Sequence, residues 1–194
     1  MAAPESMNAW ESFYVIVGSS GAALIGLQFV VITLISEVQP LLARGAISAF
    51  GTPTVFHLGG ALVISCLMSA PWPSVGSAHV ALSVAGLAGI LYGIVTSYRA
   101  THQKAYKPVW EDWVWHVILP CAAYLALTFA ALALDDTSQT PFFVIAAVAL
   151  GLLLIGIHNA WDTVIYVVVD RPGSAPQETA NATKEAAHAD AKTG

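Results

Sequence analysis

The sequence predicts an all-α membrane protein, a polytopic bundle of five transmembrane helices with a polar tail. The chain has 194 residues, of which 57% are hydrophobic and only 10% are charged, whereas a soluble domain has about 25% charged residues. The hydrophobic residues gather in five segments that reach the length of about 20 residues with which an α-helix crosses a bilayer. With only seven Lys and Arg residues, the chain also lacks the basic surface of a nucleic-acid-binding protein.

The first two spans are bounded by proline. The first is expected over residues 13–35, has Gln28 as its strongly polar interior residue, and is followed by Pro40. The second is expected over residues 47–70, contains His57, and stops at Pro71-Trp72-Pro73. Proline is common just beyond a helix end because it cannot continue the helix.

The third and fourth spans are expected over residues 75–98 and 112–134. The third contains Tyr92, and the fourth opens with three tryptophans of the kind that mark a membrane–water boundary. Pro120 has no N–H group to donate to the carbonyl of His116. We therefore expect a kink in the fourth span, with a free carbonyl acceptor near that histidine.

The fifth span is expected over residues 141–169 and is long enough to cross the bilayer with tilt. Residues 1–170 would then form one transmembrane domain. Residues 171–194 are rich in Ala, Pro, Thr and charge and have no apolar stripe. We expect them to be a disordered cytoplasmic tail.

Small residues recur at every fourth position in two spans. Such stripes let helices approach closely, so they predict packing faces for a neighbouring helix, a second copy of the chain or a membrane-protein partner. The stripes are Gly18, Ala22 and Gly26 in the first span and Ala81, Ala85, Gly89 and Gly93 in the third.

The basic residues predict the orientation. Five spans place loops 36–46 and 99–111 and the C-terminus on one side, and this side holds every Lys and Arg of the chain. The other side carries acidic residues such as Glu11 and Asp135. By the positive-inside rule, we expect the N-terminus outside and the C-terminus in the cytoplasm, in a bacterial-type cell membrane.

The first span reads FYVIVGSSGAALIGLQFVVITLIS. It resembles the opening helix of small multipass bacterial membrane proteins that are uncharacterised, which often show a Gly/Ala-rich run followed by a Gly-Leu-x-Phe-Val-like segment. The resemblance covers about one helix. It implies a multi-pass membrane protein and brings no known activity.

Polar residues within the spans predict a site. His158 and Asp162 are four residues apart, so they share one face of the fifth helix, and ionisable residues in a membrane span usually mark a functional site. By the 1.5 Å rise per residue, the polar groups of the other spans fall in the same, cytoplasmic half of the bilayer. The expected ligand or proton-relay residues are His158, Asp162, His57, His116, Gln28 and Tyr92.

Three functions follow from this layer. The first is a non-enzymatic protein, expected as an oligomer, whose chamber binds or relays a proton, an ion or a small ligand. The second is a membrane enzyme that uses a metal held by His57, His116 and His158, or a haem held by two of these histidines. The third is a membrane subunit or scaffold in which the polar contacts are structural only.

Overall fold

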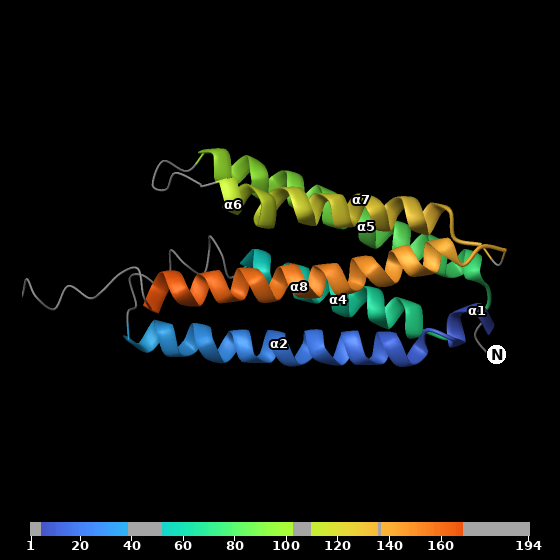
Figure 1. Cartoon of the computed structure of the whole chain (residues 1–194), viewed down its shortest axis with the longest axis horizontal. Helices are drawn as coiled ribbons and strands as arrows, with labels where there is room; N and C mark the ends of the chain where they lie inside the picture. Colours follow the sequence, from blue (N-terminus) through green and yellow to red (C-terminus); the bar gives the residue numbers. More distant parts are fainter. Residues whose placement is uncertain (1–4, 39–51, 103–109, 136, 169–194) are drawn as a thin grey trace, which may run out of the picture.

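A computed structural model describes residues 5–38, 52–102, 110–135 and 137–168. Five of its helices are long and apolar enough to cross a membrane, and they lie lengthwise beside one another (Figure 1). The predicted all-α bundle is therefore confirmed, and its helices are those of a multi-pass membrane protein. Residues 47–51 of the expected second span, the tail 171–194 and all basic residues except Arg99 lie outside the described residues.

The helices follow one another with alternating direction. As a result, the ends of α2, α5 and α8 meet the starts of α4 and α6 at one end of the bundle, which we call the α6 end; the opposite end, where α1 lies, is the α1 end (Figure 1). The elements are α1 (Glu5–Asn8), α2 (Glu11–Val38), α4 (Thr52–Ser69), α5 (Val75–His102), α6 (Trp110–Trp113), the π-helical turn η2 (Val114–Ile118), α7 (Leu119–Leu132) and α8 (Thr140–Val168).

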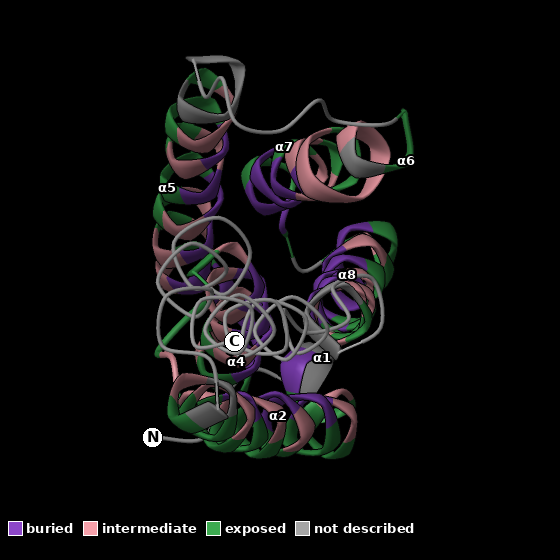
Figure 2. Ribbon diagram, turned by 90° about the vertical axis from the view of Figure 1, so that its left-hand side faces the viewer, coloured by how far each residue is buried: buried purple, intermediate pink, exposed green. Residues whose placement is uncertain are grey.

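Helix α4 holds the bundle together. It packs against α2, α5 and α8, while α7 packs against α5 and α8, and Figure 2 shows α2 lying against both α4 and α8 in the view along the helices. The interior is filled by apolar side chains, including Leu58, Ala61, Ile64, Leu127, Ile145 and Leu152. The outside is also apolar, with Leu91 and Phe129 among many exposed large side chains, as suits contact with lipid.

Glycine brings α2 against α4. A Cβ placed on Gly18 would lie 2.9 Å from the Cβ of Ser65, and one on Gly21 would lie 3.3 Å from the carbonyl oxygen of Leu58. The outer half of the expected stripe faces elsewhere: Ala22 and Gly26 are exposed, and nothing lies within 4 Å of a Cβ on Gly26.

Glycine also brings α5 against α7. A Cβ on Gly89 would overlap the ring of Tyr124, and one on Gly93 would lie 3.0 Å from Cys121 Sγ. Gly86 continues this face by packing against Thr128, whereas Ala81 and Ala85 are only half-buried. The contact face of α5 thus repeats after three and four residues, because an α-helix has 3.6 residues per turn and a strict four-residue ridge drifts off the face.

A π-helical turn precedes α7. The N–H of Leu119 donates to the carbonyl of Val114, five residues back, and Pro120 follows in the first turn of α7. Since Pro120 cannot donate to His116, the helix takes the wider spacing next to it. The irregularity expected at Pro120 is thus a π-turn, a feature frequent at functional sites.

Candidate functional site

The buried polar side chains are divided between the two ends of the bundle. Toward the α1 end, the hydroxyls of Ser65 and Thr128 donate to carbonyls of their own helices, at 2.8 and 2.9 Å. Such hydroxyls are satisfied locally. Toward the α6 end the buried polar residues are Gln28, Thr54, His57, Asn159 and Thr163, and their side chains include amides and an imidazole.

The first polar group is on α8, where the helix passes η2. Nε2 of His158 lies 3.0 Å from Oδ2 of Asp162, one turn further on. The imidazole of His158 stacks on the indole of Trp115, with ring centroids 3.7 Å apart and planes inclined by 23°. The side chains of His158 and Asp162 are 26% and 45% exposed. A carboxylate and an aromatic face therefore hold the imidazole, whose Nε2 is buried while the rest of the side chain is partly exposed.

The second group lies between α4, α5 and α7. His57 is buried, and its Nδ1 lies 3.4 Å from the hydroxyl of Tyr124. Phe56 beside it stacks on Tyr92, with centroids 3.5 Å apart. His116 lies within electrostatic range of His57. Aromatic rings thus surround the buried His57, whereas His158 is partly exposed.

The third group consists of two buried amides, one on α2 and one on α8. Asn159 is fully buried and Gln28 is 4% exposed. Within the described part of the chain, neither Nδ2 nor Oδ1 of Asn159 has a hydrogen-bond partner, and the same holds for Nε2 of Gln28. The hydroxyl of Thr163 donates to the backbone carbonyl of Asn159 at 2.8 Å.

The six expected site residues are therefore distributed over three neighbouring groups. His158 pairs with Asp162, and Tyr92 lies 6.5 Å from His57 between ring centroids. Gln28 belongs to the amide group on the other side of α4. No three His, Cys, Asp or Glu side chains of the described residues lie close enough together to hold a metal ion, so the geometry gives the three-histidine metal site no support.

Three residues outside the expected set contribute to these groups. Trp115 contacts His158 and Tyr124 contacts His57. Each contact joins two different helices, so sequence spacing alone does not reveal it. Asn159 follows His158 directly, but successive residues are about 100° apart around a helix. Its side chain lies on the side of α8 where Gly156, three residues earlier, packs against Leu58 of α4, while that of His158 faces η2.

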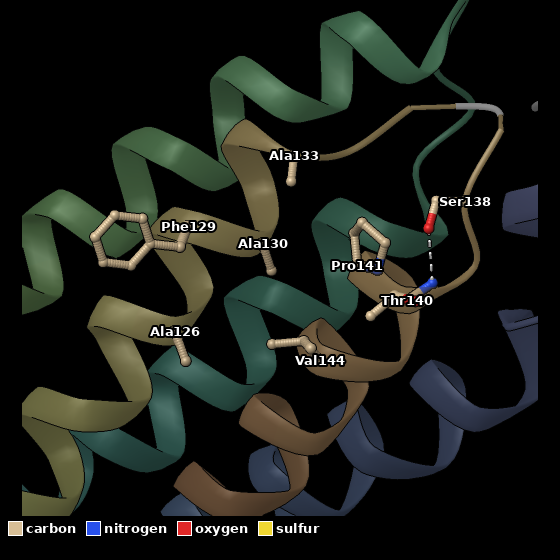
Figure 3. Close-up of a pocket in the computed structure, with 8 residues that line it drawn as sticks. All are labelled: Ala126, Phe129, Ala130, Ala133, Ser138, Thr140, Pro141 and Val144. Carbon is tan, nitrogen blue, oxygen red and sulfur yellow. Dashed lines mark hydrogen bonds between the residues drawn. The ribbon is translucent and has the colours of Figure 1, made fainter.

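An open groove lies apart from the polar groups, between α7 and α8 near the α1 end. It has a volume of about 500 Å³ and is lined largely by apolar side chains such as Ala130 and Val144. Figure 3 shows Val144 of α8 pointing toward α7, and the amide of Thr140 donating to Ser138 Oγ, 3.3 Å away. No titratable side chain lines this groove.

The turn between α7 and α8 is built around Asp135. Oδ1 of this exposed side chain accepts the N–H groups of Thr137 and Ser138, both at 2.9 Å, and the hydroxyl of Thr137 at 3.0 Å. These hydrogen bonds, that from the backbone of Thr137 first, hold the pKa of Asp135 below its ordinary value, because they stabilise the charged form.

Comparison with protein-family models, with curated proteins and with solved structures gives no match. The resemblance of the first span to small multipass bacterial proteins therefore stays a prediction.

Proposed function

We propose that this multi-pass membrane protein is not an enzyme and binds or relays a proton, an ion or a small ligand at the His158–Asp162 pair. The observation that carries the proposal is the 3.0 Å contact between these side chains on an apolar helix, with the imidazole stacked on Trp115. Ionisable groups are costly in a membrane span and are usually retained for function.

The geometry suits a group that gains and loses a proton. Histidine gains and loses a proton near neutral pH, and the carboxylate of Asp162 lies 3.0 Å from Nε2, where it would pair with the imidazolium. The Trp115 indole would add a cation–π interaction of about 0.5–2 kcal/mol with the same charged form. Asp162 is the more exposed member of the pair, so we expect a proton or a small cation to reach the buried Nε2 of His158 by way of its carboxylate.

His57 supports a relay rather than a single surface site. It lies deeper, beside Tyr124, and His116 is within electrostatic range of it and follows Trp115 in η2. Imidazole and phenol groups both donate and accept protons. A proton accepted at His158 would thus have further titratable groups on neighbouring helices.

Tryptophan fluorescence tests the site, because a protonated imidazole stacked on an indole quenches its emission. Protein in lipid nanodiscs is titrated between pH 5 and 8, the range in which histidine changes charge. We expect the tryptophan emission of the wild type to decrease as the pH is lowered. This decrease should be largely lost in His158→Gln and in Trp115→Phe. In Asp162→Asn the change should differ from that of the wild type, because a neutral amide replaces the carboxylate beside the imidazole.

The relay needs a second measurement, made in proteoliposomes with an internal pH dye and an imposed proton gradient. Proton entry should exceed that of protein-free vesicles and should drop in Asp162→Asn. Identical fluorescence titrations of wild type and His158→Gln would refute the site. A normal titration without excess proton entry would leave a binding site and refute the relay.

We further propose that the N-terminus lies outside and the α6 end faces the cytoplasm of a bacterial-type cell membrane, and that the protein is an oligomer. The distribution of Lys and Arg along the chain supports the orientation. The exposed small residues Ala22 and Gly26 on α2 are consistent with a second copy packing there. The mass of the protein complex extracted from cells in native nanodiscs, measured by native mass spectrometry, would test whether the protein is an oligomer.

A further inference from the structure

The two buried amides at the α6 end have hydrogen-bonding capacity that no group among the described residues meets. These atoms are Nδ2 and Oδ1 of Asn159 and Nε2 of Gln28. In the hydrocarbon region, each unsatisfied polar group destabilises the fold by several kcal/mol. The packing of these two side chains alone would not offset this cost. The number of unpaired donors and acceptors therefore indicates which kind of ligand can bind between the two amides.

Helix packing brings the two amides to the same level. Gly21 of α2 and Gly156 of α8 both pack against Leu58 of α4, and Gly21 also meets Leu153. Helices α2 and α8 run in the same direction (Figure 1). Gln28 is two turns beyond Gly21, and Asn159 is about two turns beyond Leu153, so both side chains reach the same height on the faces that meet α4.

Threonines complete the surroundings. Thr54 is fully buried and lies one turn before Leu58 on the antiparallel α4, which places it at the level of the amides. Thr163 is buried one turn beyond Asn159 and donates its proton to the Asn159 carbonyl. Its oxygen lone pairs are thus available as acceptors. We call Gln28, Thr54, Asn159 and Thr163 the amide node.

We propose that the amide node binds water, with at least one ordered molecule bridging Gln28 and Asn159. The free groups are two amide NH2 groups, each with two N–H donors, and one carbonyl acceptor. A cation would satisfy Oδ1 of Asn159 but would face both NH2 groups, and an anion would do the reverse. Water both accepts and donates, and buried waters typically make two to four such bonds.

This inference does not depend on His158, which lies on another face of α8. It predicts a hydrated layer between α2, α4 and α8 that is separate from the titratable pair. A hydrated amide node is therefore compatible with failure of the proton-relay proposal, and a dry node is compatible with its success.

Water-selective NMR on the wild type tests the node directly. Protein with ¹⁵N-labelled Asn and Gln side chains is studied in deuterated detergent, and the two signals are assigned from Asn159→Leu and Gln28→Leu. We expect cross-peaks from water to both side-chain amides, with the sign of a long-lived, immobilised water. The exposed Gln139 should show only the signature of mobile surface water.

Two results would overturn the proposal. One is an absence of water cross-peaks at Asn159 while Gln139 shows them. The other is a direct hydrogen bond between Gln28 and Asn159. It would appear as a scalar coupling or an NOE between the two side-chain amides, with no water cross-peak at either.

Thermal unfolding of the same variants gives an independent readout. If a shared water joins the amides, Gln28→Leu and Asn159→Leu each lower the Tm. The decrease in Tm of the double variant should then be smaller than the sum of the two single decreases. If the amides are dry, replacing either by an apolar side chain of similar size raises the Tm. Gln139→Leu, at an exposed position, is the matched control and should leave the Tm unchanged.

Discussion

The hydroxyl of Tyr124 on α7 lies 3.4 Å from Nδ1 of His57 on α4, inside the bundle. The hydroxyl of Tyr14 is also buried, but within the described part of the chain it has no hydrogen-bond partner. The same chemical change at these two tyrosines should therefore have different results.

We expect Tyr124→Phe to lower the free energy of unfolding by about 0.6–1.7 kcal/mol, the range of interhelical hydrogen bonds in membranes. Tyr14→Phe should be neutral or stabilising, because it removes an unsatisfied buried hydroxyl. Unfolding by SDS in mixed micelles, followed by circular dichroism, measures both. Equal losses in the two variants would contradict the His57–Tyr124 bond.

A second prediction concerns the contact between Gly89 of α5 and the ring of Tyr124. A Cβ at this position would overlap the ring, so Gly89→Ala should destabilise the bundle by about 1–3 kcal/mol. The control is Gly151→Ala on α8, where nothing lies within 4 Å of the added Cβ. That change should be neutral or slightly stabilising, as alanine favours a helix over glycine; a loss as large as at Gly89 would show that the α5–α7 contact is not the cause.

A third prediction concerns pH. The Asp135 carboxylate accepts three hydrogen bonds within its turn, and these lower its pKa. A carboxyl with a lowered folded-state pKa stabilises the fold above the unfolded value, about 3.9 for Asp, and this contribution is lost as pH falls through the folded value. A ¹³C NMR titration should place the midpoint of Asp135 below about 3.9, and Thr137→Ala should move it upward by removing one donor. A midpoint at or above the ordinary value would contradict the turn geometry.

A fourth prediction tests the proposed orientation. In a background in which Cys66 and Cys121 are replaced by serine, single cysteines are introduced at the exposed positions Gln139, at the start of α8, and Glu37, at the end of α2. A membrane-impermeant maleimide applied to intact cells should label Gln139→Cys and leave Glu37→Cys unlabelled. Labelling of Glu37→Cys alone would reverse the orientation.

Hydrophobic segments predicted the helices well because a membrane span needs only length and apolarity. The packing faces were harder to predict, as α2 shows. Spacing by four selected Gly18, Ala22 and Gly26, whereas the structure turns Gly18 and Gly21 toward α4 and leaves Gly26 open. The choice between Gly21 and Ala22 depends on the rotation of the helix, which its partners determine.

The candidate site shows the same limit. The pair formed by His158 and Asp162 is local to one helix, so the four-residue spacing was enough to predict it. The partners Trp115 and Tyr124 come from another helix, and their register depends on the π-turn. Asn159 was overlooked as a site residue because its adjacency to His158 in the chain conceals that it faces a different side of α8, about 100° around the helix axis.

The π-turn at Val114–Ile118 inserts one extra residue into what would otherwise be a continuous α-helix. Deleting Val117 would let the helix close with regular spacing and would rotate everything before it by about 100° around the axis. Val114 would then replace Trp115 opposite His158, and an aliphatic side chain would take the place of the indole. A single codon thus decides whether the histidine has an aromatic neighbour.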